Sequence, residues 1–334
     1  MVEELKTSCP NMNGCEDVGV ASDFAQLYKN CGKVSKLTQE ERRQLLLKEQ
    51  KEKRHNFVDR LRDFSDVFLE SEKIEIVENV DVEEMDVENN SERKKPRAFQ
   101  FMKSEWFSEI PDDLEENWLF KLVPEGFRVL VVAKRNNTVV YNKKGRVLTV
   151  KTYLPGGGLD KNSGLTVLDC IFNKTTKTIF ILDCLHWNTM SLLDSETNFR
   201  FYWLKNKFDE HSKLLETNKP FKFQILEFFP AQRPLIQDKI FDIPHINNVQ
   251  VLYEGITFYH KEVHYIFNET PLLGWLFSYM LPEKLGIDIP QENFAKMPNN
   301  YECMEKYIEH LEKKKSERRT WKQQREDRKK MDVS

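Results

Sequence analysis

The chain has 334 residues, of which 40% are hydrophobic and 31% are charged, and its formal net charge is −3. A chain of this length and composition can bury one large hydrophobic core. It has no run of 18 or more apolar residues, and it does not begin with a basic segment followed by an apolar one. We therefore expect a soluble, non-secreted protein without a membrane-spanning helix.

The cysteines and histidines do not form recognisable ligand sets. The six cysteines contain no C-x-x-C pair and have no paired histidines. His260 and His264 alternate along a predicted strand, and we interpret them as surface or hydrogen-bonded core groups. The sequence thus predicts no metal, no disulfide framework and no cofactor, and it predicts reduced thiols of the kind found in the cytosol or nucleus.

The N-terminal part of the chain divides into a polar segment and a helix. Residues 1–23 show no sustained periodicity, so we expect them to be mobile. Residues 24–64 form the next predicted domain. Thr38 and Glu41 form a capping box ahead of a group of leucines, which predicts a helix from Thr38 to Phe64.

This predicted helix lies in a basic segment, because residues 29–62 contain eleven Lys or Arg against five Asp or Glu. Its apolar residues fall in two separate groups, so we expect that it buries no continuous stripe on the body of its own chain. The pattern is typical of a helix that binds the acidic groove of a partner, and a solvated charged helix is the alternative. Its candidate contact residues are Arg42, Arg43, Lys48, Lys51, Lys53 and Arg54.

Residues 65–96 are interpreted as an acidic, flexible linker. Between residues 70 and 92 there are ten Asp or Glu against one Lys, and this charge density opposes packing. A second hypothesis is that the linker folds back on the basic helix and masks it.

Residues 97–300 form the predicted body, in which short apolar runs alternate with turn residues. Pro124-Glu125-Gly126 joins two such runs and predicts a hairpin, and the turns at 141–145 and 173–176 predict two more. The expected fold class is α+β, with a predominantly antiparallel body and minor helix. Residues 301–334 predict a basic C-terminal helix or tail, which either contacts RNA nonspecifically or stays solvated.

Several catalytic motifs are missing. Gly156-Gly157-Gly158 lacks the G-K-[ST] of a phosphate-binding loop, and neither H-E-x-x-H nor G-x-S-x-G occurs. Nothing in the sequence therefore demands an enzyme. What remains are aromatic residues at predicted strand ends and lysines in a turn, which is the chemistry of stacking on a base and binding its phosphates. These residues are Trp106, Trp187, Trp203 and Trp275, with Lys143 and Lys144 in the turn.

The segment Thr270–Met280, TPLLGWLFSYM, places a glycine directly before a tryptophan. Gly274 permits the close approach of another backbone or of a flat ligand. Trp275 is interpreted either as a core aromatic residue or as a stacking platform for a base.

An ordered set of short motifs resembles the snurportin family, over roughly residues 24–62 and 97–281. No single motif is specific, but their order and spacing are. The motifs are E-R-R at 41–43, S-E-W at 104–106, Y-x-K-x-G at 141–145, LPGG at 154–157, LDCI at 168–171, FRFYW at 199–203, PFKF at 220–223, FYHK at 258–261 and TPLxGWL at 270–276.

The resemblance implies a nuclear import adaptor. Snurportins bind the 2,2,7-trimethylguanosine cap of small nuclear RNAs, and their N-terminal helix recruits importin β. Their body resembles the nucleotidyltransferase fold of mRNA capping enzymes, which attach guanylate through a K-x-D-G lysine. Because Lys161-Asn162-Ser163-Gly164 lacks the aspartate, the resemblance implies binding without catalysis. An active guanylyltransferase-like enzyme and a generic RNA-binding protein without cap selectivity are the alternatives.

The resemblance also assigns roles to individual residues. It implies that Trp275 stacks on the base, Trp106 contacts the N2-methyl groups, Ser104 bonds the base edge, and Lys143 binds the triphosphate bridge. Lys144, beside Lys143, is a further candidate for contact with the cap.

One position of the predicted cap site departs from the family pattern. Lys103 stands where the family commonly has an aliphatic residue that packs beside the base, so this position bears on cap selectivity.

The family returns from the nucleus to the cytoplasm on an exportin that binds leucine-rich signals, and it uses its N-terminus for this contact. Met1, Leu5, Met12 and Val18 match that signal poorly.

Overall fold

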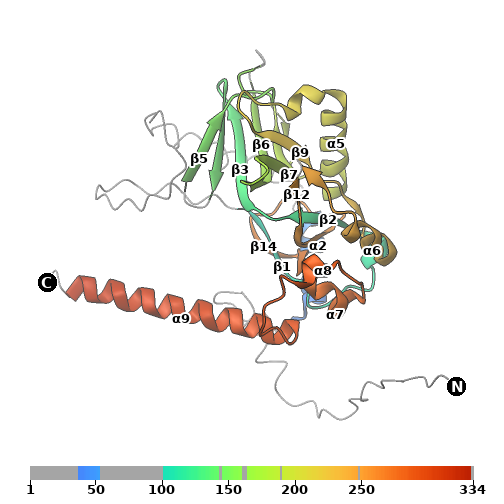
Figure 1. Ribbon diagram of the computed structural model, residues 1–334, viewed down its shortest axis with the longest axis vertical. Helices are drawn as coiled ribbons and strands as arrows, with labels where there is room; N and C mark the ends of the chain where they lie inside the picture. Colours follow the sequence, from blue (N-terminus) through green and yellow to red (C-terminus); the bar gives the residue numbers. More distant parts are fainter. Residues whose placement is uncertain are drawn as a thin grey trace, which may run out of the picture. The chain divides into compact units, whose positions relative to one another are not determined.

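The computed structural model shows an α+β fold with mostly antiparallel sheets, as the sequence predicts (Figure 1). Gln39–Met304 forms one compact unit, and helix α9 (Met304–Met331) lies almost entirely outside it. Among the described helices, none is both long and apolar enough to cross a membrane. The structure describes residues 37–52, 101–142, 145–159, 164–188, 190–246 and 249–331.

The first sheet has five strands in the order β1-β14-β13-β2-β10. Its neighbouring strands are antiparallel except for β1 and β14, which run parallel. Its strands are β1 (Met102–Trp106), β2 (Trp118–Pro124), β10 (Phe229–Pro230), β13 (Tyr253–His260) and β14 (Asn268–Phe277).

The second sheet has seven strands, in the order β5-β4-β3-β6-β7-β8, with β9 pairing parallel to β7. The predicted hairpins β4–β5 and β6–β7 are both confirmed. The strands are β3 (Phe127–Lys134), β4 (Asn137–Asn142), β5 (Gly145–Val150), β6 (Leu165–Asn173), β7 (Thr178–Trp187), β8 (Met190–Ser191) and β9 (Lys222–Ile225).

The hairpin predicted around Pro124-Glu125-Gly126 is wrong. Strands flank the turn as expected, but β2 pairs with β13 and β10, whereas β3 pairs with β4 and β6. Turn residues predict that the chain changes direction and do not say which strands will pair. A Cβ at Gly126 would lie 2.7 Å from the Phe172 carbonyl oxygen, so the chain passes close to β6 where it crosses between the sheets.

The two sheets share a hydrophobic core. One cluster combines Leu119 of β2 and Leu272 of β14 with Leu130 of β3 and Val167 of β6. Helix α5 (Thr197–Glu210) packs against β7 and contributes Leu204 to a second cluster. The remaining elements are α4 (Leu114–Asn117), η2 (Ser212–Leu215), α6 (Arg233–Phe241), β11 (His245–Ile246), β12 (Val249–Gln250), η3 (Ser278–Met280), α7 (Leu281–Leu285) and α8 (Gln291–Phe294).

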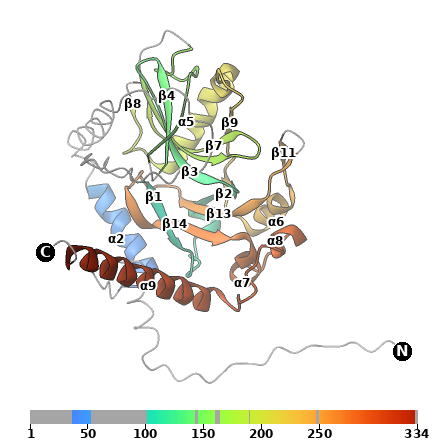
Figure 2. The same cartoon turned by 60° about the vertical axis from the view of Figure 1, so that its left-hand side comes forward.

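Helix α2 (Gln39–Glu52) begins directly after Thr38 and packs on the body, next to β14 (Figure 2). Leu46 and Leu47 pack against the core cluster between the sheets, and Arg43 is only 2% exposed. The expectation that this helix buries no stripe on its own body is therefore wrong. The predicted continuation of the helix beyond residue 52 lies outside the described residues, as does the acidic linker.

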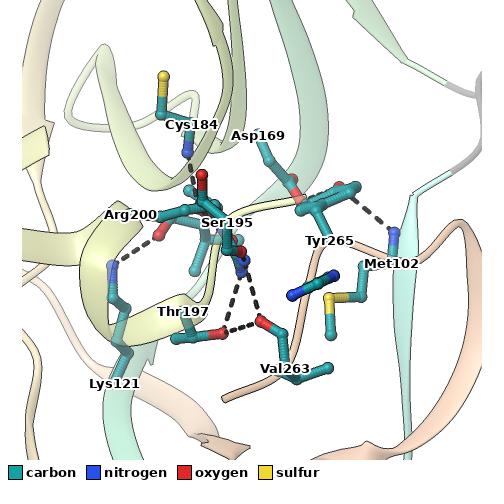
Figure 3. A network of polar contacts seen from close by, with 12 residues as sticks. Met102, Lys121, Asp169, Cys184, Ser195, Thr197, Arg200, Val263 and Tyr265 are labelled. Carbon is teal, nitrogen blue, oxygen red and sulfur yellow. Dashed lines mark hydrogen bonds and ion pairs between the residues drawn. The ribbon is translucent and has the colours of Figure 1, made fainter. Parts of the chain in front are cut away.

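Charged side chains of β2, β7 and α5 are buried together in the interior (Figure 3). Arg200 of α5 donates to Asp183 of β7, with Nη2–Oδ2 at 2.9 Å and Nε–Oδ1 at 3.0 Å. Arg200 also donates to the carbonyl oxygen of Val263 at 3.0 Å. Burial lowers the pKa of the adjacent Lys121 to about 7, although Asp183 opposes the shift. The Arg200–Asp183 pair therefore ties α5 to the sheet in a setting where a lone charge is costly.

Removing one partner of this pair should destabilise the fold strongly. We expect Asp183→Asn to lower the free energy of unfolding by about 3–5 kcal/mol, because Arg200 would keep a buried, uncompensated charge. Urea denaturation measures the change. The matched control is Glu210→Gln, which removes an exposed ion pair with Lys207 and should leave the free energy of unfolding almost unchanged. Similar small losses in both variants would contradict the interpretation.

Candidate functional site

A cavity of about 210 Å³ lies between the two sheets, and strands of both sheets line it. Ser104 of β1 and Trp275 of β14 face it from the first sheet, while Arg128 of β3, Ile171 of β6 and Leu182 of β7 face it from the second. Pockets for drug-sized ligands usually exceed about 300 Å³. The cavity therefore suits a single flat ring better than a whole nucleotide.

The pairing of β1 with β14 brings the two predicted site residues Ser104 and Trp275 together. Ser104 pairs with Thr270, the register then shifts, and Trp106 pairs with Trp275. Tyr265 holds the start of β1, because its hydroxyl accepts a hydrogen bond from the Met102 amide at 3.3 Å. The irregularity at Ser104 thus sets both tryptophans side by side at one end of the strand pair.

Gly274 is required here for a reason that the sequence did not reveal. A Cβ at this position would lie 2.3 Å from Cδ2 of Phe107. The close approach is therefore made by a core aromatic ring, and not by a ligand or another backbone. It lets β14 lie flat against Phe107 while Trp275, the next residue, turns toward the cavity.

The four tryptophans proposed from the sequence lie in different environments. Trp275 is partly buried and lines the cavity. Trp106 is 8% exposed and packs on Phe277, with ring centroids 5.7 Å apart. Trp187 and Trp203 pack edge to face, with ring centroids 5.5 Å apart, in the second hydrophobic cluster, to which α5 contributes Leu204. They therefore belong to the core.

Phe277 connects the two tryptophans of the first sheet. Its ring lies 5.6 Å from that of Trp275, at 80°, and stacks on Tyr279 at 5.2 Å. Trp106, Phe277 and Trp275 therefore form a continuous apolar wall, and of these three residues Trp275 lines the cavity.

The predicted lysines do not line this cavity among the described residues. Lys103 is exposed and neighbours Ser104 along β1, so strand alternation directs it to the opposite side. Lys143 and Lys144, between β4 and β5, lie outside the described residues. No described lysine lines the cavity, and no described group of His, Cys, Asp or Glu residues is arranged to hold a metal ion.

Sequence reasoning missed the charged residues of the cavity. Arg128 donates from Nε to Oδ1 of Asp169 at 2.9 Å and from Nη2 to Oδ2 at 2.5 Å. Burial opposes its charge, but the carboxylate of Asp169 outweighs that effect and raises the pKa of Arg128. Tyr265 also donates to Asp169, at 2.7 Å. The guanidinium is thus neutralised and held in place, so it adds little positive charge to the cavity.

Glu254 of β13 adds a carboxylate to the cavity wall. Burial raises its pKa, the nearby Glu125 raises it further, and Lys296 opposes the shift. The Lys296 ammonium lies 2.7 Å from Glu125, so its charge is already engaged. The cavity therefore combines an aromatic wall with an acidic group, which favours a flat cationic ligand. Glu254 carries no motif that would distinguish it from the other acidic residues in the sequence.

Comparison with solved structures finds partial likenesses to DNA ligase domains. The ligase domain of M. tuberculosis LigD matches with a TM-score of 0.37 at 12% identity, over 53% of this chain and 59% of that one. A mycobacterial DNA ligase D complexed with ATP and MES matches with a TM-score of 0.36 at 14% identity, over 52% of this chain and 59% of that one. The likeness to the nucleotidyltransferase fold of capping enzymes stays a prediction.

Comparison with protein families is decisive. Residues 100–278 match the family described as Snurportin1, m3G cap-binding domain, and this region contains every described residue that lines the cavity. Residues 25–63, which include α2, match the family described as Snurportin1. The first match alone covers more than half of the chain, and the chain belongs to the snurportin family.

Proposed function

We propose that this protein is a nuclear import adaptor that binds the trimethylguanosine cap of small nuclear RNAs in the cavity between the sheets. The observation that carries the proposal is the position of Trp275 and Ser104, which face one ring-sized cavity from adjacent strands. Both residues lie within the region that matches the m3G cap-binding family.

Methylation at N7 makes the guanine base cationic, and the cavity offers two groups that suit a cation. The indole of Trp275 can stack on the base, and a cation over an aromatic face gains about 0.5–2 kcal/mol. The carboxylate of Glu254 adds an opposite charge from the neighbouring strand β13. Arg128 does not offset this preference, because Asp169 neutralises it.

The apolar wall explains how the N2-methyl groups would be recognised. Two methyl groups at N2 remove both hydrogen-bond donors of that amine. Trp106 and Phe277 continue this wall beyond Trp275, and methyl groups can pack against their rings. Neither side chain has an oxygen atom that could accept a hydrogen bond from an unmethylated amine. Burying such a donor without a partner costs about 1–3 kcal/mol, which would favour the trimethylated cap over 7-methylguanosine.

The rest of the cap would lie outside the cavity. Ser104 is half-buried at the cavity wall, so its hydroxyl is available to the base edge. Lys143 and Lys144 remain the candidate contacts for the triphosphate bridge, with Lys103 as a further positive charge on β1.

A binding protein fits the cavity better than the alternative, a guanylyltransferase. That enzyme needs a nucleophilic lysine beside the base, and none of the described residues that line this cavity is a lysine. Lys121 is 1% exposed and donates to the Leu182 carbonyl oxygen at 2.5 Å. Incubation with labelled GTP and a divalent cation tests this alternative, and a covalent adduct on lysine would contradict the adaptor proposal.

The second half of the proposed function is recruitment of importin β by the basic helix. Lys48 and Lys51 are exposed on α2, Arg42 is half-buried, and Arg43 is buried. Lys53 and Arg54 lie outside the described residues. An exportin partner and shuttling between nucleus and cytoplasm follow from the family resemblance, and the N-terminal segment concerned also lies outside the described residues.

Removing the proposed stacking platform should weaken cap binding strongly. We expect Trp275→Ala to weaken binding of a trimethylguanosine cap dinucleotide by about 10–100-fold, because base stacking on an aromatic ring contributes about 1–3 kcal/mol. Titration by calorimetry measures the affinity, with 7-methylguanosine cap dinucleotide as the competitor. The control is Trp321→Ala, which truncates an exposed tryptophan of α9. Unchanged affinity in Trp275→Ala would refute the proposed site.

Cap affinity should depend on pH through Glu254. Because its pKa is raised, this carboxylate gains a proton at a less acidic pH than an ordinary glutamate. Protonation removes the charge that attracts the cationic base, so we expect affinity to fall as the pH falls through that raised pKa. Glu254→Gln should bind more weakly at neutral pH and lose this dependence, whereas the exposed control Glu262→Gln should retain it. A pH profile that is identical in all three proteins would exclude this role.

A further inference from the structure

Helix α2 is held by the body through the same arginines that the proposed function assigns to importin β. Arg42 donates from Nη1 and Nη2 to the two carboxylate oxygens of Glu105, at 2.5 and 2.8 Å. Glu105 is only 4% exposed. Gln39 donates to the same carboxylate at 3.2 Å and to the Trp106 carbonyl oxygen at 3.0 Å. Bidentate pairs of this kind are among the stronger interactions that an arginine makes.

Arg43 is buried more deeply than Arg42. Its guanidinium donates to the carbonyl oxygens of Pro271 at 3.2 Å and of Glu109 at 2.9 Å. It lies 5.2 Å from the ring centroids of both Phe107 and Trp118. Burial lowers the pKa of Arg43, and Glu40 opposes the shift. The guanidinium of this arginine therefore contacts the body and not water. No other protein can contact it while the helix stays in this position.

The C-terminal end of α2 is fixed as well. The side-chain amide of Gln50 donates to the Glu262 carbonyl oxygen at 2.7 Å and accepts from the His264 amide at 2.9 Å. Between the two ends, Leu46 and Leu47 pack on the core cluster between the sheets. The helix is thus bound to the body along its described length.

We propose that the body and importin β compete for α2, so that the docked helix is an autoinhibited form of the import signal. The inference rests on the proposed function, because it takes importin β as the partner of the helix. Importin β can engage Arg42 and Arg43 only after Glu105 and the aromatic pocket of Phe107 and Trp118 release them. The apparent affinity for importin β is then the intrinsic affinity of the helix multiplied by the fraction of molecules in which the helix is undocked.

Glu105 is the residue whose change isolates the docking. Glu105→Gln keeps the shape of the side chain and removes the charge that pairs with Arg42, without altering the helix that importin β would bind. We expect amide hydrogen exchange across residues 39–52 of the full-length protein to accelerate, and the affinity for importin β to rise about tenfold, because the charge-assisted hydrogen bonds that hold Arg42 are weakened.

A second variant guards against an indirect effect of Glu105→Gln on β1. Gln50→Met breaks the contacts at the other end of α2 and has nearly the same helix propensity as the native residue. Because it adds no polar contact for importin β, tighter binding would arise from weaker docking. The control is Glu210→Gln, since the Glu210 side chain makes an exposed ion pair with Lys207 within α5, at 2.8 Å. It should change neither measurement.

The two measurements separate the possible outcomes. Faster exchange with tighter importin β binding in both variants supports the competition. Faster exchange with unchanged affinity overturns it, and so does unchanged exchange, which would shift the masking role to another segment such as the acidic linker. If no variant binds importin β, the partner assignment in the proposed function fails and the competition fails with it, whereas the exchange data still report whether the helix docks.

Discussion

The parallel pairing of β1 with β14 is the constraint on which both the site and the helix contact depend. Its register shift between Ser104 and Glu105 puts Ser104 and Trp275 on the cavity and Glu105 against Arg42. Three consecutive residues of one strand thus serve the cavity, the helix and the aromatic wall. A change in this register would move all three functions together, since a one-residue slip reverses the direction of every side chain.

Two arginines in the interior are each neutralised by an aspartate, and this pairing determines which charge the cavity presents. Asp169 neutralises Arg128, and Asp183 neutralises Arg200. Glu254 is the acidic residue that lines the cavity, and its pKa is raised by burial and by Glu125. Because an isolated buried carboxylate is costly, a cationic base would relieve that cost while it stacks on Trp275.

Local sequence patterns predicted much of the architecture. They could not predict which strands pair when the partners are far apart in the sequence. Turn residues located β4–β5 and β6–β7 correctly, because those partners are adjacent in the chain. They misled at Gly126, where the chain passes from one sheet to the other. Trp275 and Ser104 were identified through the family resemblance, whereas Glu254 and Arg128 were missed. No spacing in the sequence indicates that β13 and β3 meet at one cavity. The burial of Arg43 was also unforeseen, because the receiving groups are backbone carbonyls and aromatic rings far away in the sequence.

The most direct test of the central claim is a crystal structure of the protein with a trimethylguanosine cap dinucleotide. The account predicts the methylated base in the cavity between the sheets, with its ring stacked on the Trp275 indole and its N2-methyl groups against Trp106 and Phe277. Ser104 should lie within reach of the base edge, and the carboxylate of Glu254 should face the positively charged ring that carries the N7-methyl group. A base bound elsewhere, or a cavity that stays closed while the dinucleotide occupies another surface, would contradict it.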